Sequence, residues 1–545
     1  MTIKLIRYVN TLRYLRPVQI YGRLWQRLNP AKPKFDPAPK LRLPSGHWVK
    51  SVERTASMLS DQSFRFLNVV GHASCAADWN DPAQEKLWLY NLHYFDDLNA
   101  AGANNRLGWH RALMSRWITE NPPGLGNGWE PYPTSLRLVN WIKWALAGNK
   151  LEPGWVDSLA VQARWLQRHI EWHLLGNHLF ANAKALVFAG LFFEGHEAAA
   201  WLAQGLKILD REVPEQVLPD GGHFELSPMY HAIILEDLLD LLNVANARPR
   251  LVSETTVLQW HEIAGRMLRW LKGLTHPDGQ VAFFNDAALG IAPDYETLAA
   301  YALRLGIDAA PVGPRSRCMY FADSGYVRLE QDNAVALLDV ARIGPDYLPG
   351  HAHADTLSFE LSLSEQRVVV NSGISQYGLG AERLRQRGTS AHSTVEVDGV
   401  DSSEVWGGFR VARRARPFGL AIKENEHSLA VACSHDGYRR LPSKPVHRRH
   451  WRLDEHALQV SDFIKGDFRT AVARYYLHPS VRVIGAGKEG QLQLSDGRAV
   501  RWSVSGGSAR VVAASWHPEF GLSIPCKLIE IIFDGHETRF EFTWD

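Results

Sequence analysis

The sequence has few cysteines, no long apolar run and almost no net charge. Its four cysteines, Cys75, Cys318, Cys433 and Cys526, lie far apart without a CxxC pair, which argues against a disulfide framework and indicates free thiols. No stretch reaches the length of a membrane span, so we expect none. The net charge of +2 creates no overall field that would select a nucleic acid.

The first 28 residues also lack the features of a signal peptide. Lys4, Arg7, Arg13 and Arg16 interrupt the apolar residues, so there is neither a continuous apolar h-region nor a small-residue cleavage site. We therefore expect a cytoplasmic or periplasmic protein. A basic amphipathic helix of this kind can touch a membrane surface, but we expect it to dock on the protein's own domain.

The pattern of apolar residues changes near residue 310. A chain of 545 residues is too long for one hydrophobic core and predicts two large domains. From Trp88 to Leu305 apolar residues recur at helical spacing, whereas after Gly313-Pro314 short runs rich in Val, Ile, Tyr and Phe predict strands. We predict three parts: an N-terminal helical segment over 1–85, a helical domain over 86–312 and a β-rich domain over 313–545.

Two histidines stand two residues apart in the segment 350–355 (GHAHAD). Alternate residues of a strand project from the same face, so His351 and His353 can converge on one point. A buried strand rarely has two such polar positions without a metal, an acid partner or a substrate to satisfy them. The alternative interpretation is a pair of structural histidines with satisfied hydrogen bonds.

A second polar cluster lies in the helical half. Asn177, His178 and Asn182 surround the start of an apolar helix, where an Asn can also act simply as the N-cap. The loop over 220–231 adds acidic, histidine and hydroxyl side chains: Asp220, His223, Glu225, Ser227, Tyr230 and His231. A capped helix start would explain part of this mixture. Together with the paired histidines, however, the two clusters predict an enzyme.

Tryptophan and arginine are concentrated in different halves of the chain. Most of the excess among the twenty tryptophans precedes residue 271, and aromatic faces stack on sugar rings as well as filling cores. Three basic clusters follow in the C-terminal half, around residues 383–387, 410–416 and 444–452. Such clusters are commonly solvated faces, and a polyanionic ligand is the competing explanation.

Five short segments then occur in a recognisable order: 88–95 (WLYNLHYF), 176–178 (GNH), 225–230 (ELSPMY), 350–355 (GHAHAD) and 391–399 (AHSTVEVDG). In this order they resemble the heparinase II/III family of polysaccharide lyases, which is related to alginate lyases of similar fold. The resemblance implies an α+β multidomain protein: an incomplete (α/α) toroid followed by an antiparallel β-sandwich, with the active site between them. It also implies a lyase that binds and cleaves an acidic polysaccharide or oligosaccharide.

The family reaction is β-elimination on a uronic acid, and the residue types suit it. Hydrogen-bond donors that neutralise the uronate carboxylate make the C5 proton easier to remove, and the resemblance gives this role to Asn177 and His178. Tyr230 matches the catalytic tyrosine, as acid or as acid and base in turn, and His351 is the second candidate base. No cofactor is required for this chemistry.

The remaining candidate residues concern substrate and metal. We expect five side chains to contact substrate: Tyr377, Arg385, Glu225, His231 and Trp129. Some family members hold a structural zinc with two histidines and an aspartate, and the histidines match His353 and His392. Asn371 stands where the aspartate is expected, and an amide is a poorer zinc ligand than a carboxylate. Without metal, these three side chains would form a hydrogen-bonded cluster.

Three further functions remain open. A uronate C5-epimerase would use the same proton abstraction, and a glycoside hydrolase would need paired carboxylates, for which Glu225 with Asp286 or Asp355 is the candidate set. A glycan-binding protein without catalytic activity is the third. Because no export signal is visible, we expect a lyase of this kind to act on the cell's own surface polysaccharide.

Overall fold

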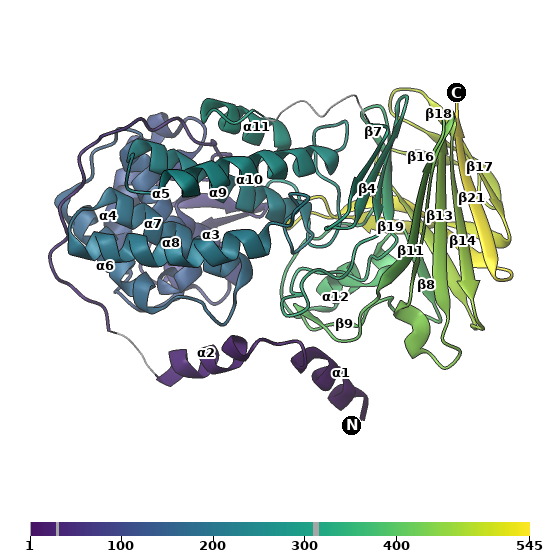
Figure 1. The fold of residues 1–545 in the computed structure, drawn as a ribbon, viewed down its shortest axis with the longest axis horizontal. Helices are drawn as coiled ribbons and strands as arrows, with labels where there is room; N and C mark the ends of the chain where they lie inside the picture. Colours follow the sequence, from purple (N-terminus) through teal and green to yellow (C-terminus); the bar gives the residue numbers. More distant parts are fainter. Residues whose placement is uncertain (1, 29–31, 309–315) are drawn as a thin grey trace.

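The computed structural model describes residues 2–28, 32–308 and 316–545. A domain of α-helices is followed by a domain of antiparallel strands, and the two lie side by side (Figure 1). This confirms the predicted fold class of a helical toroid followed by an antiparallel β-sandwich. The predicted boundary between residues 312 and 313 lies outside the described residues.

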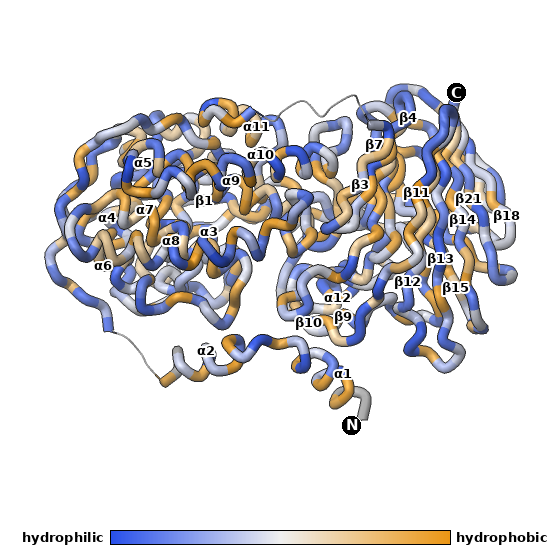
Figure 2. The backbone as a smooth tube through the Cα atoms, viewed as in Figure 1, coloured by the Kyte–Doolittle hydropathy of each residue, from blue (hydrophilic) through white to orange (hydrophobic). Residues whose placement is uncertain are grey.

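The N-terminal part is helical only at its beginning. Helices α1 (Thr2–Leu12) and α2 (Pro17–Leu28), which we call the N-terminal arm, lie along the outside of both domains (Figure 1) and carry hydrophobic as well as polar segments (Figure 2). Beyond them the chain is extended and forms a hairpin of β1 (Ser63–Phe66) and β2 (Val69–His72). The helical prediction for 1–85 is therefore wrong after α2, because repeated prolines between 33 and 44 lack the N–H that a helix needs.

The helical domain is built around α7 (Gly176–Phe192). Nearly every residue of this helix is buried, as expected for a helix that is apolar on all sides. The other helices of the domain are α3 (Lys86–Tyr94), α4 (Leu107–Glu120), α5 (Pro131–Leu146), α6 (Pro153–Arg168), α8 (His196–Gln216), α9 (Pro228–Ala247), α10 (Glu254–Gly273) and α11 (Tyr295–Arg304).

Among the described residues, no helix combines the length and the apolar composition that crossing a membrane requires.

Two large antiparallel sheets form the second domain. One has the strand order β11-β12-β13-β14-β21-β18-β17-β16, and the other runs β19-β20-β15-β7-β6-β5-β4-β3 with β8 paired to β15. The first sheet comprises β11 (Pro417–Glu424), β12 (Ser428–His435), β13 (Val446–Asp454), β14 (Ala457–Lys465), β16 (Arg482–Ile484), β17 (Glu489–Gln493), β18 (Ala499–Ser505) and β21 (Glu537–Trp544). The second comprises β3 (Cys318–Phe321), β4 (Tyr326–Gln331), β5 (Ala334–Asp339), β6 (Phe359–Leu363), β7 (Gln366–Val370), β8 (Val395–Val397), β15 (Ala471–Leu477), β19 (Gly507–Trp516) and β20 (Ile524–Phe533).

Burial along the strands shows which sheet faces the helices. In β13 buried and more exposed residues alternate, as in a sheet with one solvated face. In β5 and β6 every residue is buried, because the helical domain covers the second face of their sheet. Trp270 of α10 packs there, with its ring centroid 5.8 Å from that of Tyr326 in β4. A short helix, α12 (Ala381–Arg387), and the hairpin of β9 (Val405–Trp406) and β10 (Arg410–Val411) lie at the lower edge of this junction (Figure 1).

A buried ion pair joins the sandwich to the loops that carry the sequence motifs. Arg449 in β13 stands opposite Asp462 in β14, and its Nε lies 2.7 Å from the Asp462 carboxylate. The Arg449 Nη1 also donates to the carbonyl oxygens of Leu357 (2.8 Å) and Ser393 (2.7 Å). One guanidinium therefore holds both the segment after His353 and the residue after His392.

Removing this guanidinium should strongly destabilise the sandwich. The variant Arg449→Ala leaves the Asp462 carboxylate buried without its main partner, so we expect a loss of about 3–5 kcal/mol of unfolding free energy. Denaturant unfolding followed by circular dichroism measures it. The matched control is Arg501→Ala, which breaks an exposed pair with Asp545 and should change stability by less than about 1 kcal/mol. Equal stabilities of the two variants would contradict the assignment.

Candidate active site

The Asp286 carboxylate is the centre of the polar cluster between the two domains. It accepts hydrogen bonds from His351 Nδ1 (2.8 Å), from His353 Nε2 (2.7 Å) and from both terminal nitrogens of Arg383, one of them at 2.7 Å. Burial alone would raise the pKa of Asp286, but Arg383 and the two histidines outweigh it and hold that pKa well below its usual range. Asp286 is therefore a permanent anion that orients three side chains.

The backbone around Asp286 is held in an unusual conformation. Asn285 and Leu226 both have positive φ angles, 56° and 58°, which non-glycine residues seldom adopt. The Asn285 side chain donates to the Leu226 carbonyl (2.9 Å) and accepts from the His353 N–H (2.9 Å). These bonds maintain the strain and align the chain before Asp286 with the paired histidines, as strained backbone at functional sites often does.

Tyr230 reaches the same place from the first turn of α9. Ser227 is the N-cap: its hydroxyl accepts from the Tyr230 N–H (3.2 Å) and donates to the Asp286 carbonyl. The Tyr230 hydroxyl lies 2.9 Å from that of Tyr377, and its ring stacks on His351 with centroids 3.9 Å apart. Burial, reinforced by Tyr377, raises the pKa of Tyr230 well above its usual value, so the phenol stays protonated.

His351 lies between two carboxyl groups of different kinds. Its Nδ1 faces Asp286, which leaves Nε2 as the free ring nitrogen, 3.6 Å from a carboxyl oxygen of Glu225. Burial raises the pKa of Glu225 and favours its neutral form. Neither Glu225 oxygen has a hydrogen-bond partner within the described part of the chain. Glu225 thus lies beneath the histidine as a carboxyl group that ionises less readily than an exposed one.

Asn177 and His178 enter the site at the start of α7. Leu175 and Gly176 both have positive φ, and a side chain at Gly176 would collide with Leu348 and press on Glu225. His178 Nδ1 lies 3.2 Å from Glu171, and its ring packs on Tyr132 with centroids 4.5 Å apart. Burial opposes protonation of His178, but the negative charge of Glu171 outweighs it and raises the pKa of His178. His178 therefore favours the cationic form.

Three predicted substrate-binding residues lie elsewhere. His231 is fully buried, stacks on Trp270 and bonds to the Met267 carbonyl (2.9 Å), while Trp129 is a core residue that donates to the Asn121 carbonyl. Arg385 pairs with Glu382 (2.7 Å) and with His517 (2.9 Å). The prediction is wrong for His231 and Trp129, because both side chains are buried in the core. Arg385 lies on the other side of α12 from Arg383, since residues two apart face opposite sides of a helix, and its role in substrate binding stays a prediction.

The arginine that reaches the site is Arg383. It and Arg387, one helical turn apart, occupy the buried side of α12, where Arg387 donates to the Ala352 carbonyl (2.8 Å). Arg383 also lies over the Tyr377 ring, 4.9 Å from its centroid. In the sequence both arginines belong to a basic cluster that we interpreted as a solvated face or a polyanion site. Arg383 and Arg387 are four residues apart and therefore share one face of the short helix that lies between Gly380 and Gly388. This spacing is the signal that distinguishes them from Arg385.

A potential metal-binding set lies directly behind the site. His353, Asp355 and His392 are buried, and one ligand atom from each lies within 4.8 Å of the others. His353 Nδ1 is 3.2 Å from His392 Nε2, a separation compatible with two nitrogens bound to one zinc. His353 donates its other ring nitrogen to Asp286, the usual arrangement behind a zinc-bound histidine. The donor types and spacing therefore fit zinc.

Asn371, which we expected at the place of the third ligand, has a structural role. Its backbone N–H donates to Glu360 (2.8 Å), and its side-chain oxygen accepts from the Ser393 N–H (3.0 Å). The carboxylate beside the two histidines belongs to Asp355, two positions after His353. The sequence analysis considered Asp355 only as a hydrolase carboxylate.

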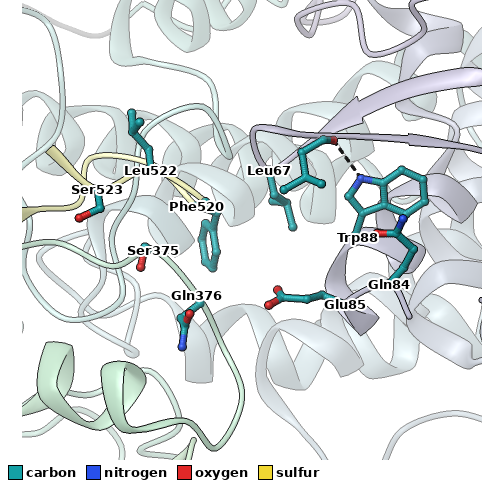
Figure 3. Close-up of a pocket in the computed structure, with 11 residues that line it drawn as sticks. Leu67, Gln84, Glu85, Trp88, Ser375, Gln376, Phe520, Leu522 and Ser523 are labelled. Carbon is teal, nitrogen blue, oxygen red and sulfur yellow. Dashed lines mark hydrogen bonds between the residues drawn. The ribbon is translucent and has the colours of Figure 1, made fainter. Parts of the chain in front are cut away.

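A pocket of about 210 Å³ opens beside Tyr377. Its walls come from the β1–β2 hairpin, from residues 84–88 and from two sandwich loops, and Glu85 points across it toward Gln376 (Figure 3). Phe520 separates this pocket from the site, because its ring packs edge-on against Tyr377 with centroids 4.9 Å apart. Ser375 and Gln376 in the wall directly precede Tyr377, so the pocket and the cluster share one loop.

Two family models match the chain, one on each side of this site. The model described as Heparinase II/III N-terminus matches residues 147–299, and the one described as Heparinase II/III-like, C-terminal matches residues 313–545. The chain belongs to the heparinase II/III family. The residues quoted for the resemblance lie within these matches, except those of the segment 88–95.

Individual relatives agree with the family assignment and differ in how much of their length matches this chain. The heparin-sulfate lyase of Bacteroides stercoris is 28% identical over 300 residues, which is 50% of this chain and 43% of that protein. The chain therefore matches less than half the length of that lyase. FtsZ-localized protein C of Caulobacter vibrioides is 25% identical over 470 residues, 79% of this chain and 77% of that one.

Solved structures show the same architecture. A crystal structure of heparinase III superposes with a TM-score of 0.67 at 17% identity, covering 88% of this chain and 79% of that one. Another, the heparinase III product of gene BT4657, has a TM-score of 0.64 at 18% identity and covers 86% and 80%. At these identities the likeness concerns the fold, which agrees with the toroid and sandwich described above.

Proposed function

We propose that this chain is a polysaccharide lyase that cleaves a uronic-acid-containing acidic polysaccharide by β-elimination. The observation that carries the proposal is the contact between a protonated phenol and an oriented imidazole. Tyr230 packs on His351 at 3.9 Å, and Asp286 holds that imidazole by its Nδ1. An acid and a base therefore lie side by side, within reach of neighbouring atoms of one sugar linkage.

The first requirement of the reaction is to make the C5 proton removable. The uronate carboxylate opposes a developing carbanion until its charge is neutralised. His178, whose raised pKa favours the cation, and the Asn177 amide supply the donors in this proposal. Both project from the start of α7, where the N-terminus of the helix adds a favourable field for an anion.

The second requirement is a pair of proton transfers. His351 Nε2 accepts the C5 proton, the C–H electrons form the C4–C5 double bond, and the C4–O4 bond breaks. Tyr230 then gives its phenolic proton to O4, and the hydrogen bond from Tyr377 stabilises the phenolate that remains. We assign the base to His351 and not to Tyr230, because the raised pKa of Tyr230 disfavours a phenolate before substrate binds.

The hydrolase alternative lacks its carboxylate pair. Such enzymes place two carboxyl groups on opposite sides of the scissile bond, and one of them must donate a proton. Asp286 is fully buried and held ionised by Arg383, and Asp355 is buried beside His353 and His392. Glu225, whose pKa burial also raises, lies beneath His351 and not across a linkage from either aspartate.

Substrate class and catalytic competence belong to this proposal as well. Several relatives are named heparin-sulfate lyases, which supports an acidic glycosaminoglycan or a similar uronate polymer as substrate. The relative that shares the most of this chain's length among those described has a name that refers to localisation with FtsZ and not to catalysis. A glycan-binding role without chemistry is therefore the second candidate function.

We also propose that His353, His392 and Asp355 hold a zinc ion. When bound, zinc would cross-link the segment 350–355 to the loop before β8 and fix the His353 ring against Asp286. His353 and His392 are both suited to this role, because burial lowers their pKa values and keeps them neutral. The proton transfers above use none of these three residues.

The elimination reaction is tested by ultraviolet absorbance. We expect absorbance to rise when the protein acts on one of a panel of uronate polysaccharides, since the new C4–C5 double bond is conjugated with the carboxylate. Tyr230→Phe removes the acid and should lower the rate at least about 100-fold. Tyr320→Phe, an exposed tyrosine in β3, is the matched control and should keep full activity.

Each contrary result has a different meaning. A flat trace with shortened chains would indicate hydrolysis. A flat trace with altered uronate configuration would indicate epimerisation. Saturable binding without any chemical change would support the glycan-binding role. A rise in absorbance that Tyr230→Phe leaves intact would disprove the assignment of the acid while retaining the lyase.

The charge of His178 predicts the alkaline limb of the pH profile. Because its pKa is raised in the folded protein, the cation persists to a higher pH than that of an exposed histidine and is lost as the pH rises through that pKa. We expect kcat/KM to fall there. In His178→Gln the amide does not titrate, so this fall should disappear while activity drops about 100-fold. An unchanged alkaline limb in the variant would contradict the role.

Zinc is tested by metal analysis and thermal melting, neither of which depends on activity. We expect about one zinc per chain in protein purified without chelator, and a lower Tm after chelation. His392→Ala should lose the metal, whereas His427→Ala, which alters an exposed histidine, should retain it. A metal-free protein whose Tm does not respond to added zinc would contradict the proposal and favour the hydrogen-bonded histidine pair.

A further inference from the structure

The N-terminal arm docks on the protein mainly through hydrogen bonds, an ion pair and ring contacts. Trp406 Nε1 donates to the Thr11 hydroxyl (3.1 Å), and the Gln19 amide donates to the Tyr347 carbonyl (3.1 Å). The Arg16 guanidinium lies over the Tyr347 ring, 3.7 Å from its centroid. Arg16 also pairs with Glu215 of α8, so the arm rests on both domains, as the sequence analysis expected. Apart from Tyr8, which packs on Trp406, and Val18, the residues that it turns inward are mainly polar.

The apolar side of the arm faces solvent. Eight apolar residues at helical spacing are between 54% and 77% exposed: Leu5, Val9 and Leu12 in α1, and Ile20, Tyr21, Leu24, Trp25 and Leu28 in α2. A helix that packs only on its own protein turns such residues inward. Here the two helices follow one another along one side of the molecule (Figure 1), so the exposed residues form an extended hydrophobic surface of the kind that marks an interaction site.

The charge of the arm identifies the partner. Residues 1–35 contain eight lysines and arginines and no aspartate or glutamate, although the whole chain has a net charge of only +2. Arg13 and Arg23 are exposed beside the apolar residues. Apolar residues that insert between acyl chains, flanked by arginines that meet phosphate groups, are characteristic of helices that lie in the surface of an anionic bilayer.

We propose that the outer face of α1 and α2 binds the surface of an anionic lipid bilayer, with both helices parallel to it. A second copy of the chain fits this face less well, since two such arms would bring like charges together. The proposal does not depend on the lyase activity. Trp406 of the β9–β10 hairpin contacts the arm, so the proposal also places this hairpin next to the membrane. Phe409 of the same hairpin packs on Tyr377.

Sedimentation with vesicles tests the proposal on the full chain. We expect the protein to bind vesicles of phosphatidylcholine with added phosphatidylglycerol, to bind pure phosphatidylcholine weakly, and to dissociate at high salt. Leu24→Ser with Trp25→Ser should weaken binding at least about tenfold, because two large apolar side chains no longer enter the bilayer. Arg13→Gln with Arg23→Gln should weaken it about fivefold for each charge.

The matched control is Leu258→Ser with Leu303→Ser, which changes two equally exposed leucines on α10 and α11 and should leave binding unchanged. Thermal melting shows whether each variant is folded. A wild-type protein that stays in the supernatant with anionic vesicles would overturn the proposal. So would vesicle binding that the arm variants do not weaken. A dimer in gel filtration that Leu24→Ser with Trp25→Ser dissociates would assign the face to a second copy instead.

Discussion

The carboxylate of Asp286 orients the polar side chains at the junction of the two domains. It is buried, and burial of a lone anion would be very unfavourable. The surrounding structure therefore supplies a guanidinium from α12 and two imidazoles from the segment 350–355, and each of these groups is oriented by the bond it makes. The same charge thus fixes the free nitrogen of His351 toward the site and directs the other ring nitrogen of His353 toward His392.

Support for this centre comes from distant parts of the sandwich. Arg449, inside the sheet, holds the carbonyls of Leu357 and Ser393, and Arg387 holds the carbonyl of Ala352. Each arginine satisfies backbone groups of loops that have no regular partners of their own, which buried loops require. The left-handed conformations of Asn285 and Leu226 are maintained by other bonds, because the Asn285 amide and the Tyr326 hydroxyl both donate to the Leu226 carbonyl. Rigid sheets and helices thereby position a site that is built almost entirely of loops.

The accuracy of the sequence-based predictions varied with the type of residue. The change from helical to strand spacing near residue 310 predicted the order of the domains, since periodicity reflects which face of each element is buried. The motifs located Tyr230 and His351 correctly in one cluster, and the expected substrate contact Tyr377 lies beside them. The catalytic and substrate-binding roles of these residues stay predictions. His231 and Trp129 were wrong because a histidine or tryptophan in a motif-rich segment can equally belong to the core. Arg383 was missed because a run of arginines does not reveal which of them faces inward.

The sequence by itself determined the two-domain order, the family motifs and the amphipathic, basic character of the N-terminal arm. These features follow from local residue spacing and composition, which can be recognised within a short stretch of the sequence. Only the tertiary structure decided that Asp286 meets Arg383 across 97 positions, that Asp355 and not Asn371 accompanies His353 and His392, and that the arm turns its apolar side outward. Each of these three outcomes depends on which surfaces pack together. Residues that are far apart in the chain but pack together leave no periodic pattern in the sequence.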